Sequence, residues 1–140
     1  MCPDRLDIEW RDRLDIEWRR ITDFIPKEEV KVFDGAIEYG DIKQGQLGDC
    51  WLLCSIAAVS EYEDLVRDLI QDRENRANAQ CGLYVVKLCK DGEWKRVVVD
   101  NFIHCYPLKG PIFSHDRGIA VWVMLLDKAF AKWNGSYLTL

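Results

Sequence analysis

The residues best suited to covalent chemistry lie between Gln44 and Cys50. Gly45 and Gly48 allow the tight turns of a loop, and an apolar run follows Cys50. This predicts a polar loop that leads into a helix, with Cys50 on its first turn. The first turn has unpaired backbone N–H groups and the positive end of the helix dipole. A thiolate is stabilised there, so the thiol pKa is expected to fall below the ~8.5 of free cysteine.

Gln44 precedes Cys50 by six residues, so its side-chain amide can reach the same point through a tight loop. An amide N–H beside the backbone N–H of a cysteine can form an oxyanion hole. The pattern therefore predicts a nucleophilic cysteine and its oxyanion-hole donor. From spacing and residue types alone, a buried structural cysteine at a helix start is an equally good interpretation.

Three helices are expected around this loop. The run from Trp51 to Val59 is apolar apart from two residues, and a helix that is apolar on nearly all sides is typically buried. Apolar residues with helical spacing predict a second, amphipathic helix over residues 61–72. A stripe with spacings of three, four and seven predicts a third helix over residues 121–133, which ends before Asn134.

The strand signals are shorter. Residues 83–88 are rich in strand formers, Lys90-Asp91-Gly92 is a hairpin signal, and residues 94–99 return as the partner strand. Brief strands are also expected over residues 30–33 and within 102–114. Together with the helices, this small antiparallel sheet over 83–99 predicts an α+β fold.

The N-terminal segment carries an octapeptide duplication. Residues 4–11 are repeated without change as residues 12–19, a period that matches no solenoid or heptad. Alternating apolar residues in the first copy, Leu6, Ile8 and Trp10, are typical of a short strand or extended segment. We therefore divide the chain into an N-terminal segment over 1–20 and one core over 21–140.

Composition excludes several classes of protein. The 140 residues include 19 basic and 24 acidic side chains, a net charge of −5, with 49% hydrophobic residues. The length and the hydrophobic fraction suit one compact domain. The negative net charge does not indicate the basic surface that nucleic-acid binding requires. No apolar run reaches the roughly 20 residues of a membrane span, and the first 20 residues are too charged for a signal peptide. We therefore expect an intracellular, cytoplasmic protein by default.

The cysteines do not form a recognisable metal or disulfide pattern. None of the six is part of a Cys-x-x-Cys pair, and the two histidines, His104 and His115, are not at ligand spacing. We expect the five cysteines other than Cys50 to be reduced and mostly packed thiols.

The segment around Cys50 resembles the active-site signature of the calpain family of papain-like cysteine proteases. The match runs over Gln44-Gly45-Gln46-Leu47-Gly48-Asp49-Cys50-Trp51-Leu52-Leu53. Further matching pieces follow in order: Asp91-Gly92-Glu93-Trp94, Val97 to Asp100, Trp122, Leu125 to Lys132 and Asn134-Gly135-Ser136-Tyr137. The resemblance implies the first subdomain of a papain-like protease core that acts on protein substrates, with Cys50 as nucleophile and Gln44 as the oxyanion-hole side chain.

The resemblance also implies a calcium site ahead of the catalytic loop. In the family, backbone carbonyls around the turn at Asp34-Gly35 and the acid at the Asp41 position help to hold the ion, with oxygen ligands of the kind calcium prefers. The family also supplies a glutamate two residues before the tryptophan that matches Trp122. Here that position is Ala120, and one extra residue separates Gly35 from Asp41.

A thiol protease also needs a histidine base and a residue, commonly asparagine, that orients it. In calpain relatives both lie on a second subdomain, beyond the motif at 134–137, so no catalytic histidine or asparagine is assigned among these 140 residues. Nothing in the sequence places His104 or His115 opposite Cys50. We expect the chain alone to be inactive as an endopeptidase. The alternative is a catalytically inactive calpain-like binding or regulatory module.

Overall fold

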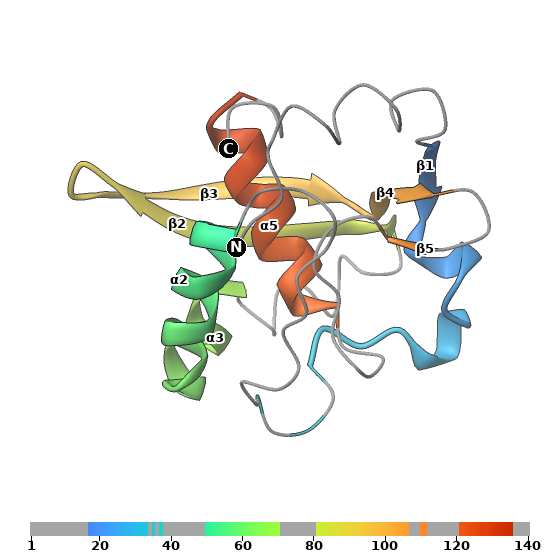
Figure 1. Cartoon of the computed structure of the whole chain (residues 1–140), viewed down its shortest axis with the longest axis horizontal. Helices are drawn as coiled ribbons and strands as arrows, with labels where there is room; N and C mark the ends of the chain where they lie inside the picture. Colours follow the sequence, from blue (N-terminus) through green and yellow to red (C-terminus); the bar gives the residue numbers. More distant parts are fainter. Residues whose placement is uncertain are drawn as a thin grey trace.

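In the part of the chain that the structure describes, helices pack against two small antiparallel sheets (Figure 1). The computed structural model describes residues 17–33, 35, 37, 50–70, 81–106, 110–111 and 121–135. The strands are β1 (Glu17–Arg20), β2 (Leu83–Lys90), β3 (Glu93–Asp100), β4 (Phe102–Tyr106) and β5 (Gly110–Pro111). The helices are α2 (Cys50–Ser60), α3 (Glu63–Ile70) and α5 (Trp122–Trp133), with 3-10 turns η1 (Ile21–Asp23) and η2 (Lys27–Glu29). This confirms the α+β class expected from the sequence.

Strands β2 and β3 form the predicted hairpin. They pair antiparallel from Leu83 opposite Asp100 to Lys90 opposite Glu93. The two residues of the turn, Asp91 and Gly92, both have positive φ, at 55° and 79°. Positive φ at both central residues matches the right-handed twist of the strands, which explains why this local signal located the hairpin.

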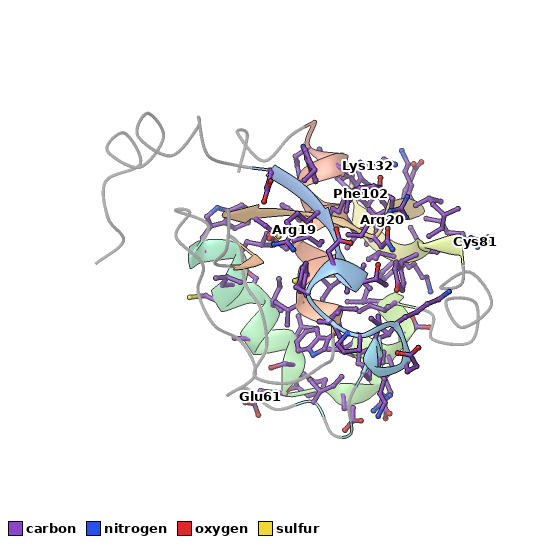
Figure 2. The ribbon with its side chains drawn as sticks, turned by 90° about the vertical axis from the view of Figure 1, so that its right-hand side faces the viewer. Arg19, Arg20, Glu61, Cys81, Phe102 and Lys132 are labelled. Carbon is purple, nitrogen blue, oxygen red and sulfur yellow. The ribbon has the colours of Figure 1, made fainter. Side chains whose placement is uncertain are left out.

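The second sheet joins segments that are far apart in the sequence. Strand β1 pairs with β4, with Arg20 opposite Phe102, and β5 pairs with the other edge of β4. The guanidinium of Arg20 lies 4.5 Å from the centroid of the Phe102 ring, and both side chains are labelled close together in Figure 2. The extended segment expected for the first octapeptide copy, residues 4–11, lies outside the described residues. Strand β1 is formed instead at the end of the second copy, over Glu17–Arg20.

Residues 30–33 do not form the brief strand expected there. Among these four residues, Lys31 alone is a bridge residue. Its carbonyl accepts a hydrogen bond of 3.0 Å from the N–H of Val121. This contact ties the segment to the start of α5. A single bridge replaces the strand.

Helix α5 packs on β2 and β3 and forms the centre of the core (Figure 1). The bounds of α5 confirm the helix predicted over 121–133. The sequence pattern indicated one apolar face, but nearly every residue of the first two turns is buried, including Asp127 and Lys128. Figure 1 shows α2 and α3 on one side of α5, and β1, β4 and β5 on the other.

Helix α2 is buried on one face only. Leu52, Leu53 and Ile56 belong to the core, at 4–6% exposed. The opposite face, which includes Trp51, Cys54, Ser55 and Ala58, is exposed. The expectation that the helix is buried on nearly all sides is therefore wrong for this chain. Apolar residue types favour burial, but they do not say which element covers each face.

The cysteines differ in part from expectation. The thiols of Cys54, Cys81, Cys89 and Cys105 are free, which agrees with reduced side chains. Only Cys105 is buried, and the other three are exposed. The expectation of mostly packed thiols is therefore wrong for these three residues.

A buried lysine holds α5 to the corner between the two sheets. The ammonium group of Lys128 donates to the carboxylate of Asp100 and to the backbone carbonyls of Asp100 and Phe102. It also lies 5.2 Å from the centroid of the Trp18 ring. Three acceptors use all three N–H donors of an ammonium group. The last residue of β3 and the first of β4 are thus fixed to one point on α5.

The electrostatics of this corner follow from its burial. Burial lowers the pKa of the Lys128 ammonium, and the carboxylate of Asp100 acts in the opposite direction. Burial alone would raise the pKa of Asp100, but the hydrogen bonds from Lys128 and the Phe102 N–H, with the charges of Lys128 and Lys132, hold that pKa below its usual value. The ion pair therefore favours a charged Asp100 in the folded state.

Replacement of Lys128 by methionine tests the corner. Lys128→Met keeps an unbranched side chain that is one atom shorter, but leaves two carbonyls and a partly buried carboxylate without their donor. We expect the free energy of unfolding to fall by about 1–3 kcal/mol, toward the low end because Asp100 is half exposed. Urea denaturation measures the change.

Lys132→Met is the matched control. Lys132 lies on the same helix and donates to the carbonyl of Val98, but it is exposed. Its replacement should cost less than about 0.5 kcal/mol. An equal fall in the free energy of unfolding in the two variants would contradict the view that Lys128 stabilises this corner more than Lys132 does.

Candidate active site

Cys50 is the first residue of α2. The backbone thus has the helix start that the sequence predicted, with Cys50 where the unpaired N–H groups of the first turn lie. The first turn of α2 carries no acidic residue, so no carboxylate within that turn offsets the positive end of the dipole. This backbone arrangement suits an anionic sulfur.

The start of α2 is fixed from two directions. Leu52 and Leu53, at 4% and 5% exposed, anchor its first turn in the core. The ring of Trp51, which is 47% exposed, meets the ring of Phe130 on α5 edge-on, with centroids 5.5 Å apart and planes at 70°. Such edge contacts between aromatic rings are favourable beyond the area they bury. The position of Cys50 therefore depends on both the core and α5.

The other sequence-predicted site residues are placed only in part. Gln44, Asp41, Ala120 and His115 lie outside the described residues. The backbone of His104 lies on β4, opposite Trp18. Figure 1 shows β4 on the other side of α5 from the start of α2. The structure thus does not bring the strand that carries His104 to the candidate nucleophile.

Of the turn at which the resemblance implies a calcium site, the structure describes Gly35. The carbonyl of Gly35 accepts a hydrogen bond of 2.9 Å from the guanidinium of Arg67 on α3. Within the ranges that the structure describes, no group of three or more His, Cys, Asp or Glu side chains could hold a metal ion. The guanidinium of Arg67 therefore already occupies one acceptor at the turn around which the resemblance places carbonyl ligands, and the calcium site stays a prediction. Sequence reasoning did not single out Arg67, because the contact depends on how α3 packs.

Comparison with known proteins identifies the family. A family model described as calpain family cysteine protease matches residues 6–140. The chain belongs to the calpain family of cysteine proteases. The bounds of the match cover the described helices and sheets, so the fold is that of the first subdomain of a calpain protease core.

Individual calpain relatives align over most of the chain. The calpain-type cysteine protease ADL1 of Oryza sativa subsp. japonica is 38% identical over 110 residues, 78% of this chain and 5% of the relative. The calpain-1 catalytic subunit of Homo sapiens is 39% identical over 112 residues, 78% of this chain and 15% of the relative. Calpain-8 of Rattus norvegicus is 36% identical over 141 residues, 99% of this chain and 18% of the relative. The chain spans less than a fifth of each of these proteins.

No helix among the described residues has the length and apolar character needed to cross a bilayer.

The free cysteines predict a clear order of reactivity. Burial raises the pKa of the Cys105 thiol to about 11, with Glu17 and Asp23 adding to the effect and Arg19 opposing it. At pH 8 only about 0.1% of such a thiol is ionised, and the thiolate is the reactive form. We expect iodoacetamide to modify Cys54, which is exposed, while Cys105 stays unmodified until denaturant is added. Peptide mass spectrometry checks the order, and equal rates in the folded protein would contradict it.

Proposed function

We propose that this chain supplies the nucleophile and the oxyanion hole of a calpain-like cysteine endopeptidase. The supporting observation is that Cys50 begins a helix whose first turn is anchored in the core, in a chain that belongs to the calpain family. Gln44 is proposed as the side-chain donor of the oxyanion hole. The division into an N-terminal segment over 1–20 and a protease core over 21–140 is part of the same proposal.

The proposed reaction passes through a thioester. The Cys50 thiolate attacks the carbonyl carbon of a peptide bond, a C–S bond forms, and the carbonyl oxygen becomes negative. The Cys50 backbone N–H and the Gln44 amide donate hydrogen bonds to that oxygen. Such hydrogen bonds are usually the largest single contribution to stabilisation of the transition state. The C–N bond then breaks, the amine leaves with a proton, and water hydrolyses the thioester in a second step.

The proton transfers require a base that we place outside these 140 residues. A general base must lie about 3 Å from the proton that it takes, and β4, the strand of His104, is on the other side of α5 from the start of α2. We propose that a second protease subdomain supplies the histidine and asparagine. The exposed apolar residues of α2, Trp51 and Ala58, offer a surface for it. Proteins are the proposed substrates, and the free thiols suit a reducing, intracellular compartment.

A catalytically inactive binding module is the second candidate. The observation that favours it is the same exposed face of α2, which leaves Trp51 47% exposed next to the candidate nucleophile. In that case the face would bind a partner protein without any covalent step. Reactivity of Cys50 separates the two functions.

Competitive alkylation tests the proposed nucleophile. Because of its position at the start of α2, Cys50 should react with substoichiometric iodoacetamide at neutral pH faster than Cys54, by about tenfold. Cys54 is the internal control, since it is exposed and lies one turn further along the same helix. Fragmentation mass spectrometry resolves the two sites. Equal rates, or labelling of Cys50 only in denaturant, would favour the binding module.

The peptidase activity of the isolated chain tests the proposed location of the base. Loss of the base reduces turnover by several orders of magnitude in related triads. We expect casein hydrolysis by the 140-residue chain to be indistinguishable from that of Cys50→Ala. Robust hydrolysis that Cys50→Ala abolishes would show that a base lies within the chain.

A further inference from the structure

Arg67 on α3 makes a group of contacts that the proposed reaction does not use. Its Nη2 donates to the carbonyl of Gly35, at 2.9 Å, and to the carboxylate of Glu63, at 2.6 Å. Its Nε donates to the same carboxylate oxygen, at 2.8 Å. The guanidinium carbon lies 4.7 Å from the centroid of the Phe33 ring. One cation thus joins two residues of the 33–37 segment to the first turn of α3.

The charges of this cluster are balanced. Glu63 lies in the first turn of α3, where the helix dipole favours a carboxylate. The Arg67 guanidinium neutralises that carboxylate and is directed at the Gly35 oxygen by the same pairing. Hydrogen bonds in which the donor or acceptor is ionised are the stronger ones. The cluster therefore contacts Phe33 and Gly35 without any additional ion.

Gly35 belongs to the turn around which the calcium expectation places carbonyl ligands. Calcium binds oxygens at about 2.3–2.6 Å, so an ion on the Gly35 carbonyl would lie close to the guanidinium that already donates to it. The two positive charges would repel each other. The sequence also has Ala120 where a carboxylate ligand was expected. The contacts around Gly35 and the alanine at position 120 thus both disfavour a calcium ion next to this turn.

We infer that the Arg67 guanidinium takes the place of a calcium ion in this chain. It binds the Gly35 carbonyl and stacks on Phe33, and so connects the segment ahead of the catalytic loop to α3. Helix α3 in turn packs against α2. The Arg67 contacts therefore connect Phe33 and Gly35, through α3, to the helix that begins with Cys50. The consequence is a protease core in which Phe33 and Gly35 are held against α3 independently of calcium. The inference concerns ordering of this segment and does not require the chain to be active.

Calcium titration of the unaltered chain is the first test. We expect no change in the thermal unfolding midpoint between 1 mM chelator and about 5 mM calcium, a range that covers the weak end of protein calcium sites. Magnesium at the same concentration controls for ionic strength. A calcium-specific rise in the midpoint would overturn the inference.

Hydrogen exchange of residues 33–37 is the second test. Arg67→Gln removes the charge and both ion-pair hydrogen bonds, and should raise exchange in this segment by about tenfold or more through local opening. Lys87→Gln is the matched control, because Lys87 forms an exposed ion pair of 3.2 Å with Asp68 on the same helix. The control should leave exchange in the segment unchanged within about twofold. Equal exchange in the two variants would overturn the inference.

A gain-of-function variant completes the experiment. Arg67→Gln combined with Ala120→Glu removes the guanidinium and restores the expected carboxylate. Calcium, and not magnesium, should then slow exchange of residues 33–37 in the double variant. If calcium has no effect on that exchange, the claim that Arg67 occupies the place of the metal is wrong.

Discussion

The structure depends on the ammonium group of Lys128, which is buried where three backbone and side-chain acceptors converge. Its partners are the end of β3 and the start of β4, and these strands belong to different sheets. An ion pair of this kind does not need to add stability over an apolar core. Its effect is positional, because the three hydrogen bonds join α5 to the end of β3 and to the start of β4.

Helix α5 transmits this arrangement to the candidate nucleophile. Phe130 follows Lys128 by two residues, about 200° around the helix, so the two side chains project from different sides of α5. Lys128 contacts the corner between the sheets, and Phe130 contacts Trp51, which is next to Cys50 in the sequence. The backbone at the start of α2 is thereby set relative to the sheets through one buried helix. A nucleophile needs such rigid support, since catalysis depends on small differences in position.

Local signals in the sequence located most elements, and long-range contacts account for what the sequence missed. Asp91-Gly92 specified the β2–β3 hairpin, and the glycine-rich loop and apolar run placed the helix start at Cys50. The pairing of Glu17 with Cys105 has no local signal, and neither does the burial of Lys128, whose acceptors lie 26 and 28 residues away. The exposed face of α2 was missed for the same reason. Of the site, the position of Cys50 on its helix was predictable, whereas Gln44 and Asp41 remain predictions.

The central claim is that the start of α2 stabilises the thiolate of Cys50. The most direct test is the pH dependence of Cys50 alkylation in a variant in which the other five cysteines are replaced by serine, with Cys105 replaced by alanine if folding requires it. We expect a Cys50 pKa clearly below the ~8.5 of free cysteine in the folded chain, and a return to that value in denaturant. A folded-state pKa at or above the denatured value would contradict it.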